Sequence, residues 1–89
     1  MIRCELTIVN KLGLHARAAT KLAAMAGRYA CQIRAGREQP TIDVKSIMPL
    51  LLLAANQGTK LIFEFDGPDE QDACNAMTQL LADRFGEGS

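Results

Sequence analysis

The chain of 89 residues has a single histidine, His15, where a loop-like stretch turns into a helical pattern. Gly13 stands two residues before it and Arg17 two residues after it. The amides of a first helical turn, here those of Ala16 and Arg17, lack intrahelical acceptors, and the helix dipole adds partial positive charge beside them. An imidazole, free backbone donors and a guanidinium in one small volume suit a nucleophilic histidine that carries a phosphoryl group. A plain surface histidine before a helix fits the same residues, so the chemistry alone leaves both interpretations open.

Ser46 is a second position of interest, because it precedes the apolar run "IMPLLLLAA", residues 47–55. Serine is favoured at the N-cap of a helix, where it stabilises by about 1 kcal/mol, so we expect Ser46 to cap a helix. The run is apolar on more than one face and leaves Ile47, Met48 and Leu51 partly outside. Such a patch is typical of a partner surface, although neighbouring loops that cover it would explain it equally.

Hydrophobic periodicity predicts the elements that must hold these residues in place. Alternation with a period of two indicates strands, and apolar stripes at helical spacing indicate helices. The expected strands cover residues 2–9, 31–35, 41–44 and 60–66, and the expected helices cover residues 16–26, 47–55 and about 68–81. Pro40 suggests that the short third strand lies at an edge of the sheet, or that the proline marks the start of the strand. The final residues "GEGS", 86–89, are expected to fray.

The element order is therefore β-α-β-β-α-β-α, within a single domain that covers residues 1–89. Each strand has one apolar and one polar face, which favours an antiparallel sheet covered by helices on one side. The expected fold is a two-layer α+β open-faced sandwich of four strands and three helices.

Composition excludes several classes of function. Ten basic residues balance ten acidic ones, and there is one Tyr and no Trp, which disfavours a nucleic-acid partner. The chain opens on a strand pattern rather than a signal peptide, and its longest apolar run is too short to span a bilayer, so we expect a cytoplasmic protein without membrane insertion. Cys4, Cys31 and Cys74 are scattered, so reduced thiols, no metal and no cofactor are expected. A free-standing hydrolase is disfavoured, because His15 has no nucleophile or carboxylate partner evident in the sequence.

The stretch "GLHARAA", residues 13–19, closely resembles the active-site motif of the histidine-containing phosphocarrier (HPr) family of the bacterial phosphoenolpyruvate-dependent phosphotransferase system. "VKSIMPLLLLAANQG", residues 44–58, resembles the family's regulatory-serine segment, and "GPDEQDA", residues 67–73, resembles the lead into its last helix. The longer stretch "NKLGLHARAATKL" looks most like the nitrogen-regulatory branch, NPr. The resemblance covers nearly the whole chain and implies an HPr-like fold.

The resemblance also implies a reaction and its partners. His15 would be phosphorylated on Nδ1 by phosphorylated Enzyme I and would pass the group to an EIIA-type acceptor of the sugar or nitrogen system. Arg17 matches the arginine beside the phosphate, and Ser46 matches a serine that a dedicated HPr kinase/phosphatase modifies in some bacteria. Ala18 departs from the pattern, because many members have proline there. The departure bears on loop rigidity and phosphohistidine lifetime rather than on the activity itself.

By the same resemblance, the apolar patch lies beside His15 and is rimmed by basic and polar side chains that suit acidic partner surfaces. The expected partner surface consists of Thr20, Lys21, Lys45, Ile47, Met48 and Leu51.

Two hypotheses of different class follow. The first is a monomeric histidine phosphocarrier, which turns over only through its partners and is not a free-standing enzyme. The alternative is a regulatory binding module of the same fold, which acts through its surface and Ser46 phosphorylation. The motif histidine favours the first hypothesis, because a purely regulatory module would not need it.

Overall fold

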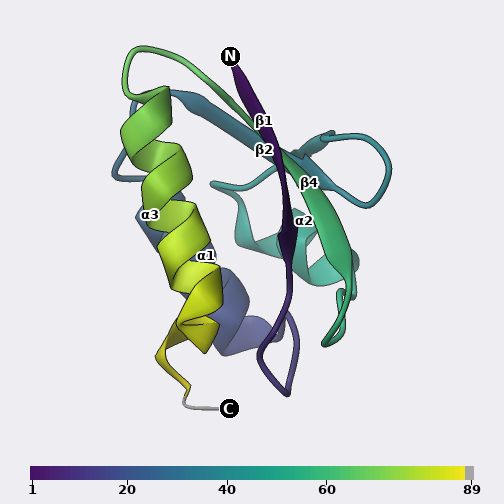
Figure 1. Ribbon diagram of the computed structural model, residues 1–89. Coiled ribbons are helices and arrows are strands. Elements are labelled where there is room, and N and C mark those ends of the chain that lie inside the picture. Colours follow the sequence, from purple (N-terminus) through teal and green to yellow (C-terminus); the bar gives the residue numbers. More distant parts are fainter. Residues whose placement is uncertain (88–89) are drawn as a thin grey trace.

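A computed structural model describes residues 1–87 of the chain (Figure 1). Its elements follow the predicted order, with a short 3-10 helix, η1, added after the last α-helix. Their bounds are Ile2–Thr7 for β1, Ala16–Ala26 for α1, Gln32–Gly36 for β2, Ile42–Asp43 for β3, Ile47–Leu52 for α2, Lys60–Asp66 for β4, Glu70–Ala82 for α3 and Arg84–Gly86 for η1.

The four strands form one antiparallel sheet in the order β1-β4-β2-β3. Strand β4 is interior and pairs with β1 on one side, where Cys4 lies opposite Phe63, and with β2 on the other, where Ala35 lies opposite Phe63. The short strand β3 lies at an edge, as Pro40 predicts.

The helices cover one face of this sheet and leave the other polar. Figure 1 shows α1 and α3 side by side along the sheet, with α3 packed on β1 and β4, and α1 in contact with both α2 and α3. On the opposite face, Arg3 of β1 donates a 2.8 Å hydrogen bond to Glu64 of β4. The α+β open-faced sandwich is therefore confirmed.

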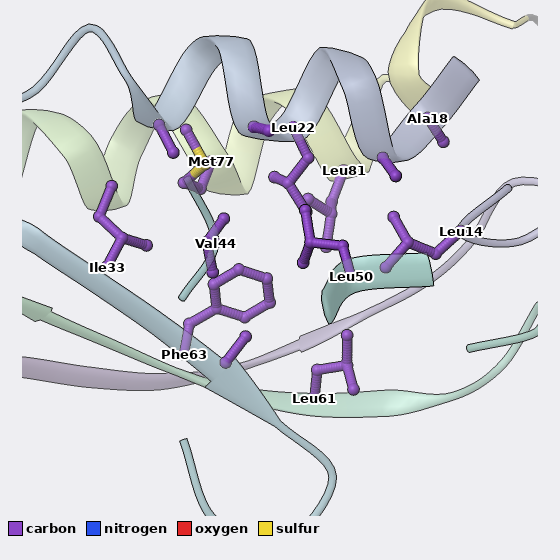
Figure 2. Close-up of a cluster of buried hydrophobic side chains, with 14 of the residues drawn as sticks. Leu14, Ala18, Leu22, Ile33, Val44, Leu50, Leu61, Phe63, Met77 and Leu81 are labelled. Carbon is purple, nitrogen blue, oxygen red and sulfur yellow. The ribbon is translucent and has the colours of Figure 1, made fainter. Parts of the chain in front are cut away.

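The core lies between the two layers and takes its side chains from the predicted apolar faces. Figure 2 shows Leu22 and Met77 from the helices pointing toward Phe63 and Leu61 of the sheet. Leu50 of α2 points into the same core and is fully buried. Burial of such side chains is the main favourable term for a domain of this size.

Several element ends differ from the predictions. Strand β1 stops at Thr7. The Ile8 amide still donates to the carbonyl of Thr59 at 2.9 Å, but the Ile8 carbonyl accepts from the amide of Gly58 at 2.7 Å, which is out of register with the ladder. Helix α2 stops at Leu52, and Ala54 then takes a left-handed backbone with a φ of +49°. Strand β3 keeps only two residues.

The predicted fraying of the tail is wrong for Gly86 and Glu87. Phe85 is buried at 1 % exposure and anchors the segment that follows α3, and Glu87 reaches back to the start of α1. The remaining two residues of that prediction, Gly88 and Ser89, lie outside the described residues. None of the helices within residues 1–87 is long and apolar enough to cross a membrane.

Candidate functional site

His15 is reached through a tight loop between β1 and α1. Gly13 has a φ of +71°, and a Cβ built there would lie 2.6 Å from the carbonyl oxygen of Ala55. Glycine alone satisfies both constraints. The next residue, Leu14, donates a 2.8 Å hydrogen bond to the same carbonyl. The loop is thereby tied to the segment that follows α2.

His15 itself is the N-cap residue of α1. Its backbone is extended, with φ −84° and ψ −178°, and its Nδ1 accepts a hydrogen bond from the amide of Arg17 at 3.3 Å. The Nδ1 lone pair therefore faces the amide end of the helix. The amides of Ala16 and Ala18 belong to the same first turn, where helix geometry gives a donor no intrahelical acceptor.

The other ring nitrogen of His15 meets a carboxylate. Nε2 lies 2.5 Å from Oε2 of Glu87. A carboxylate only accepts hydrogen bonds, so the proton of the neutral ring belongs on Nε2, while the bond from Arg17 requires a bare Nδ1. Two independent contacts thus agree on one tautomer, which leaves Nδ1 unprotonated. The ring is 29 % exposed, so a reactant can reach it.

Glu87 is held in place from two sides. Asn10, fully buried in the loop before His15, donates from Nδ2 to Oε1 of Glu87 at 2.9 Å. Further back, Nζ of Lys21 donates to the carbonyl of Phe85 at 2.7 Å. We call residues 84–87 the C-terminal strap, because they run from the end of α3 to the head of α1.

The strap carboxylate is ionised at neutral pH. Burial opposes the charge on Glu87, but the hydrogen bonds from Asn10 and His15 outweigh it and place the pKa of the carboxyl below its usual value. Lys21 adds a favourable charge. The Glu87 side chain is 9 % exposed, so its negative charge faces the imidazole rather than solvent.

Arg17 lines an open surface hollow beside the ring, together with Leu12, His15, Ala16 and the strap residues Gly86 and Glu87. Within residues 1–87, the Arg17 guanidinium makes no ion pair, so it is available to an anion brought to Nδ1. The structure thus brings His15, Ala16 and Arg17 together as predicted. Over the same residues, no group of three His, Cys, Asp or Glu side chains is arranged to hold a metal ion.

Comparison with known proteins identifies the family. The family model described as the phosphorylation site of the HPr component of the phosphotransferase system matches residues 2–83. The chain belongs to the HPr phosphocarrier family. The phosphocarrier protein HPr of Pseudomonas aeruginosa is 52 % identical over 85 residues, which are 94 % of each chain. That of Cupriavidus necator is 49 % identical over 88 residues, which are 99 % of each chain.

Solved structures agree with this family. The crystal structure of HPr-C-His from Thermoanaerobacter tengcongensis superimposes with a TM-score of 0.92 at 33 % identity, over 98 % of both chains. A phosphocarrier protein NPr from Shewanella violacea is 36 % identical over 85 residues, 96 % of this chain and 93 % of the relative. The two relatives named HPr are more similar than this NPr, and the nitrogen-branch assignment stays a prediction.

Ser46 occupies the N-cap of α2 but makes no capping hydrogen bond through its side chain. Its Oγ instead donates to Oδ2 of Asp43 at 3.4 Å. The predicted location is right and the predicted hydrogen bond is wrong, because the carboxylate of Asp43 offers the hydroxyl a charged acceptor nearby.

The predicted partner surface is only partly assembled beside the site. Ile47 and Met48 of α2 are 41 % and 67 % exposed. Leu51 is half-buried, and Leu52, which the sequence reasoning left out of this surface, is 80 % exposed. Helix α2 packs against α1, which carries the site at its first turn.

The basic rim of that surface divides between the two ends of α1. Thr20 and Lys21 are exposed on α1 near its start, and the Thr20 hydroxyl donates to the carbonyl of Ala16 at 2.8 Å. Lys45, by contrast, donates from Nζ to the carbonyl of Tyr29 at 2.7 Å, just beyond the other end of α1. The structure therefore does not bring Lys45 to His15.

Glu87 and Asn10 are the site residues that sequence reasoning missed. Asn10 lies in the quoted motif stretch, but asparagine is a common turn residue in loops. Its presence there therefore does not mark it as a site residue. Glu87 is 72 positions from its imidazole partner and belongs to a glycine-flanked tail that composition assigns to fraying. No periodicity or spacing links the two.

Proposed function

We propose that His15 accepts a phosphoryl group on Nδ1 from phosphorylated Enzyme I and passes it to an EIIA-type acceptor. The observation that carries this proposal is the bare Nδ1 aimed at the first-turn amides of α1, with the unpaired Arg17 side chain beside it within the described residues. A ring that served only as a surface cap would need neither the arginine nor the carboxylate on Nε2.

The chemical step is a displacement at phosphorus. The Nδ1 lone pair forms the new N–P bond while the bond from phosphorus to the donor atom of Enzyme I breaks, and that electron pair returns to the donor. The Arg17 amide, which bonds Nδ1 in the free protein, is then released to a phosphoryl oxygen. The guanidinium of Arg17 and the helix dipole compensate the transferred negative charge. The same groups serve the reverse displacement toward the acceptor.

Docking of donor and acceptor is the second part of the proposal. Exposed Ile47 and Met48 on α2, and Leu12 beside the hollow, supply apolar contact area, and Thr20 and Lys21 supply a polar rim. A methionine adapts to partners of different shape, which suits a carrier that must meet a donor and an acceptor in turn.

The decisive experiment incubates the protein with phosphoenolpyruvate and Enzyme I from the same organism and measures its intact mass under alkaline conditions. We expect a single phosphoryl adduct that is acid-labile and absent from His15→Ala. An Enzyme I that phosphorylates another HPr but leaves this chain unmodified would refute the proposal. Addition of a candidate EIIA protein then tests whether the adduct is passed on.

The regulatory alternative has less support at Ser46. The hydroxyl hydrogen-bonds to Asp43, so a phosphate there would face a like charge, and Lys45 is engaged elsewhere. Phosphorylation of Ser46 by an ATP-dependent kinase therefore stays a prediction, to be tested by mass measurement with such a kinase. The monomeric state, the single domain and the cytoplasmic location also stay predictions.

A further inference from the structure

We propose that Glu87 is a positioning residue for phosphoryl transfer, which fixes the tautomer of His15 through the C-terminal strap. This inference rests on the proposed function of His15. Its starting point is the 2.5 Å contact between Nε2 and Oε2 of Glu87, made from opposite ends of the chain.

The argument begins with what a free imidazole does. A neutral histidine exchanges its proton between the two nitrogens, and the partner of one nitrogen decides the state of the other. Glu87 can only accept, so it holds the proton on Nε2 and leaves Nδ1 unprotonated throughout the reaction. When the N–P bond forms, the ring becomes electron-poor, and the adjacent carboxylate stabilises the resulting positive charge.

The Glu87 carboxylate is itself held in place, so it can keep the proton on Nε2 of His15. Asn10 holds its second oxygen at 2.9 Å, and buried Phe85 anchors the strap two residues earlier. Asn10 also donates to the carbonyl of Gly13 at 2.7 Å, so one amide group ties the strap to the loop that carries the histidine. The ring, the loop and the strap form one connected unit.

Glu87→Gln tests this network because glutamine has one accepting oxygen where glutamate has two. Nε2–H and the Asn10 amide both need an acceptor, so in the variant one of them meets an NH₂ group. An NH₂ group that faces His15 favours the tautomer with the proton on Nδ1, which cannot attack phosphorus. The matched control is Glu5→Gln, an exposed glutamate on β1.

Two readouts separate this inference from the function on which it rests. The first is the tautomer of the single histidine, read from the imidazole ¹⁵N chemical shifts at about pH 9. We expect the Nε2–H form in the wild type and in Glu5→Gln, and a shift toward the Nδ1–H form in Glu87→Gln. This readout needs no partner protein, so it stands even if Enzyme I fails to phosphorylate the chain.

The second readout is the transfer rate from phosphorylated Enzyme I. We expect kcat to fall by roughly tenfold or more in Glu87→Gln, with KM for the donor nearly unchanged because Glu87 is almost buried. An unchanged tautomer in Glu87→Gln would overturn the inference. So would a shifted tautomer with an unchanged kcat, since the proton position would then not limit the reaction.

A separate observation supports a second inference, which does not depend on the first. Cys4 on β1 and Cys74 on α3 place their Sγ atoms 3.8 Å apart, and both side chains are half-buried. The third cysteine, Cys31, is fully buried. We infer that Cys4 and Cys74 form a reversible oxidation site that closes to a disulfide with a low-molecular-weight disulfide as oxidant.

The reaction balances in two exchange steps. One protein thiolate attacks glutathione disulfide and releases one glutathione thiolate, and the second protein thiolate then displaces the other. Burial and the neighbouring Cys74 raise the pKa of Cys4 to about 11, so the first step is slow at neutral pH. The bond would join β1, which leads to the His15 loop, to α3, which leads to the strap.

Oxidation of the purified full chain with glutathione disulfide tests this second inference. We expect the intact mass to fall by two hydrogens, a peptide map that links Cys4 to Cys74, and a higher Tm in the oxidised form. Cys31→Ser should behave as the wild type, and Cys74→Ser should lose the cross-link. Accumulation of glutathione adducts in the wild type, or no reaction at all, would overturn it.

Discussion

His15 makes a hydrogen bond through each ring nitrogen, and the two bonds require one nitrogen to be protonated and the other unprotonated. Nδ1 accepts from the Arg17 amide and Nε2 donates to Glu87. Nδ1 is therefore unprotonated before any partner binds, as the proposed function requires. At the scale of single residues, two kinds of residue should affect phosphoryl transfer measurably. The first kind positions the ring of His15, and the second kind stabilises the negative charge of the incoming phosphoryl group.

Arg17 belongs to the second kind, because its exposed guanidinium is unpaired within the described residues and lies by the ring. We expect Arg17→Ala to slow phosphoryl transfer by roughly a hundredfold, the size of effect seen when one donor to a developing anion is removed. Arg17→Lys should recover part of the rate, since it keeps the charge but loses the fork geometry. Quench-flow measurement of transfer checks both. A rate that falls together with the free energy of unfolding would point to a structural role instead.

Gly13 is one of the residues that position the ring of His15. A matched pair of glycine substitutions tests how much it contributes to stability. Gly13→Ala should destabilise the fold by more than about 1 kcal/mol, because φ is +71° and the new Cβ would meet the Ala55 carbonyl at 2.6 Å. Gly58→Ala is the control, since φ is +91° but nothing lies within 4 Å of its Cβ. Urea denaturation of both variants separates the free-energy cost of backbone strain from the cost of the steric clash with Ala55. Equal losses would show that the contact with Ala55 adds nothing.

At the scale of elements, α1 presents the site and α2 presents the partner surface. The first turn of α1 contains Ala18, where many family members have proline. Ala18 is fully buried and belongs to the hydrophobic core. Its amide is one of the first-turn donors that proline would remove.

Ala18→Pro should therefore leave the protein folded but shorten the lifetime of its phosphohistidine. Proline is tolerated in a first turn, so we expect the free energy of unfolding to change by no more than about 1 kcal/mol. Ala24→Pro, on the exposed side in the middle of α1, is the control and should cost about 3 kcal/mol. Decay of the phosphorylated form, followed by intact mass, measures the lifetime. A longer lifetime in Ala18→Pro would contradict the role given to the Ala18 amide.

Met48→Glu tests the contribution of α2. The side chain is 67 % exposed, so the variant should unfold within about 0.5 kcal/mol of the wild type while KM for Enzyme I rises several-fold. Gln79→Glu on the exposed side of α3 adds the same charge away from this helix and serves as the control. Unchanged transfer kinetics in Met48→Glu would remove α2 from the docking surface.

At the scale of the whole molecule, the C-terminal strap joins the last helix to the first. The pKa of Glu87 is lowered in the folded protein, so its contribution to stability is present above the ordinary carboxyl pKa and is lost as pH falls through the lower folded value. The titratable groups that face this carboxylate are His15 and Lys21. Protonation of Glu87 would therefore weaken the attachment of the strap.

The difference in free energy of unfolding between the wild type and Glu87→Gln should accordingly shrink as pH falls from about 7 to about 3. Denaturant titrations at several pH values give this difference directly. A difference that stays constant over the range would mean that the ionised carboxylate adds no stability. Glu5→Gln again serves as the control, because its carboxylate is exposed.

The predictable part of the fold comes from local periodicity. Helix α1 and strand β4 have the bounds that the alanine-rich stripe and the "KLIFEFD" alternation predict. The predicted ends of β1 and α2 lie beyond the observed ends. The Ile8 carbonyl bonds to the distant Gly58 amide out of register with the ladder, and Ala54 takes a left-handed backbone two residues after α2. Hydrophobic periodicity carries no signal for either feature.

The sequence by itself determined the antiparallel sandwich, the position of His15 at a helix start and the arginine beside it, because each depends on residues within one turn or one strand. Only the tertiary structure decided which tautomer His15 takes, that Ser46 turns to Asp43, and that Lys45 lies at the far end of α1. Those outcomes depend on groups that the fold brings together from distant positions. The clearest case is Glu87, whose carboxylate reaches the ring because a buried Phe85 turns the chain back at the end of α3.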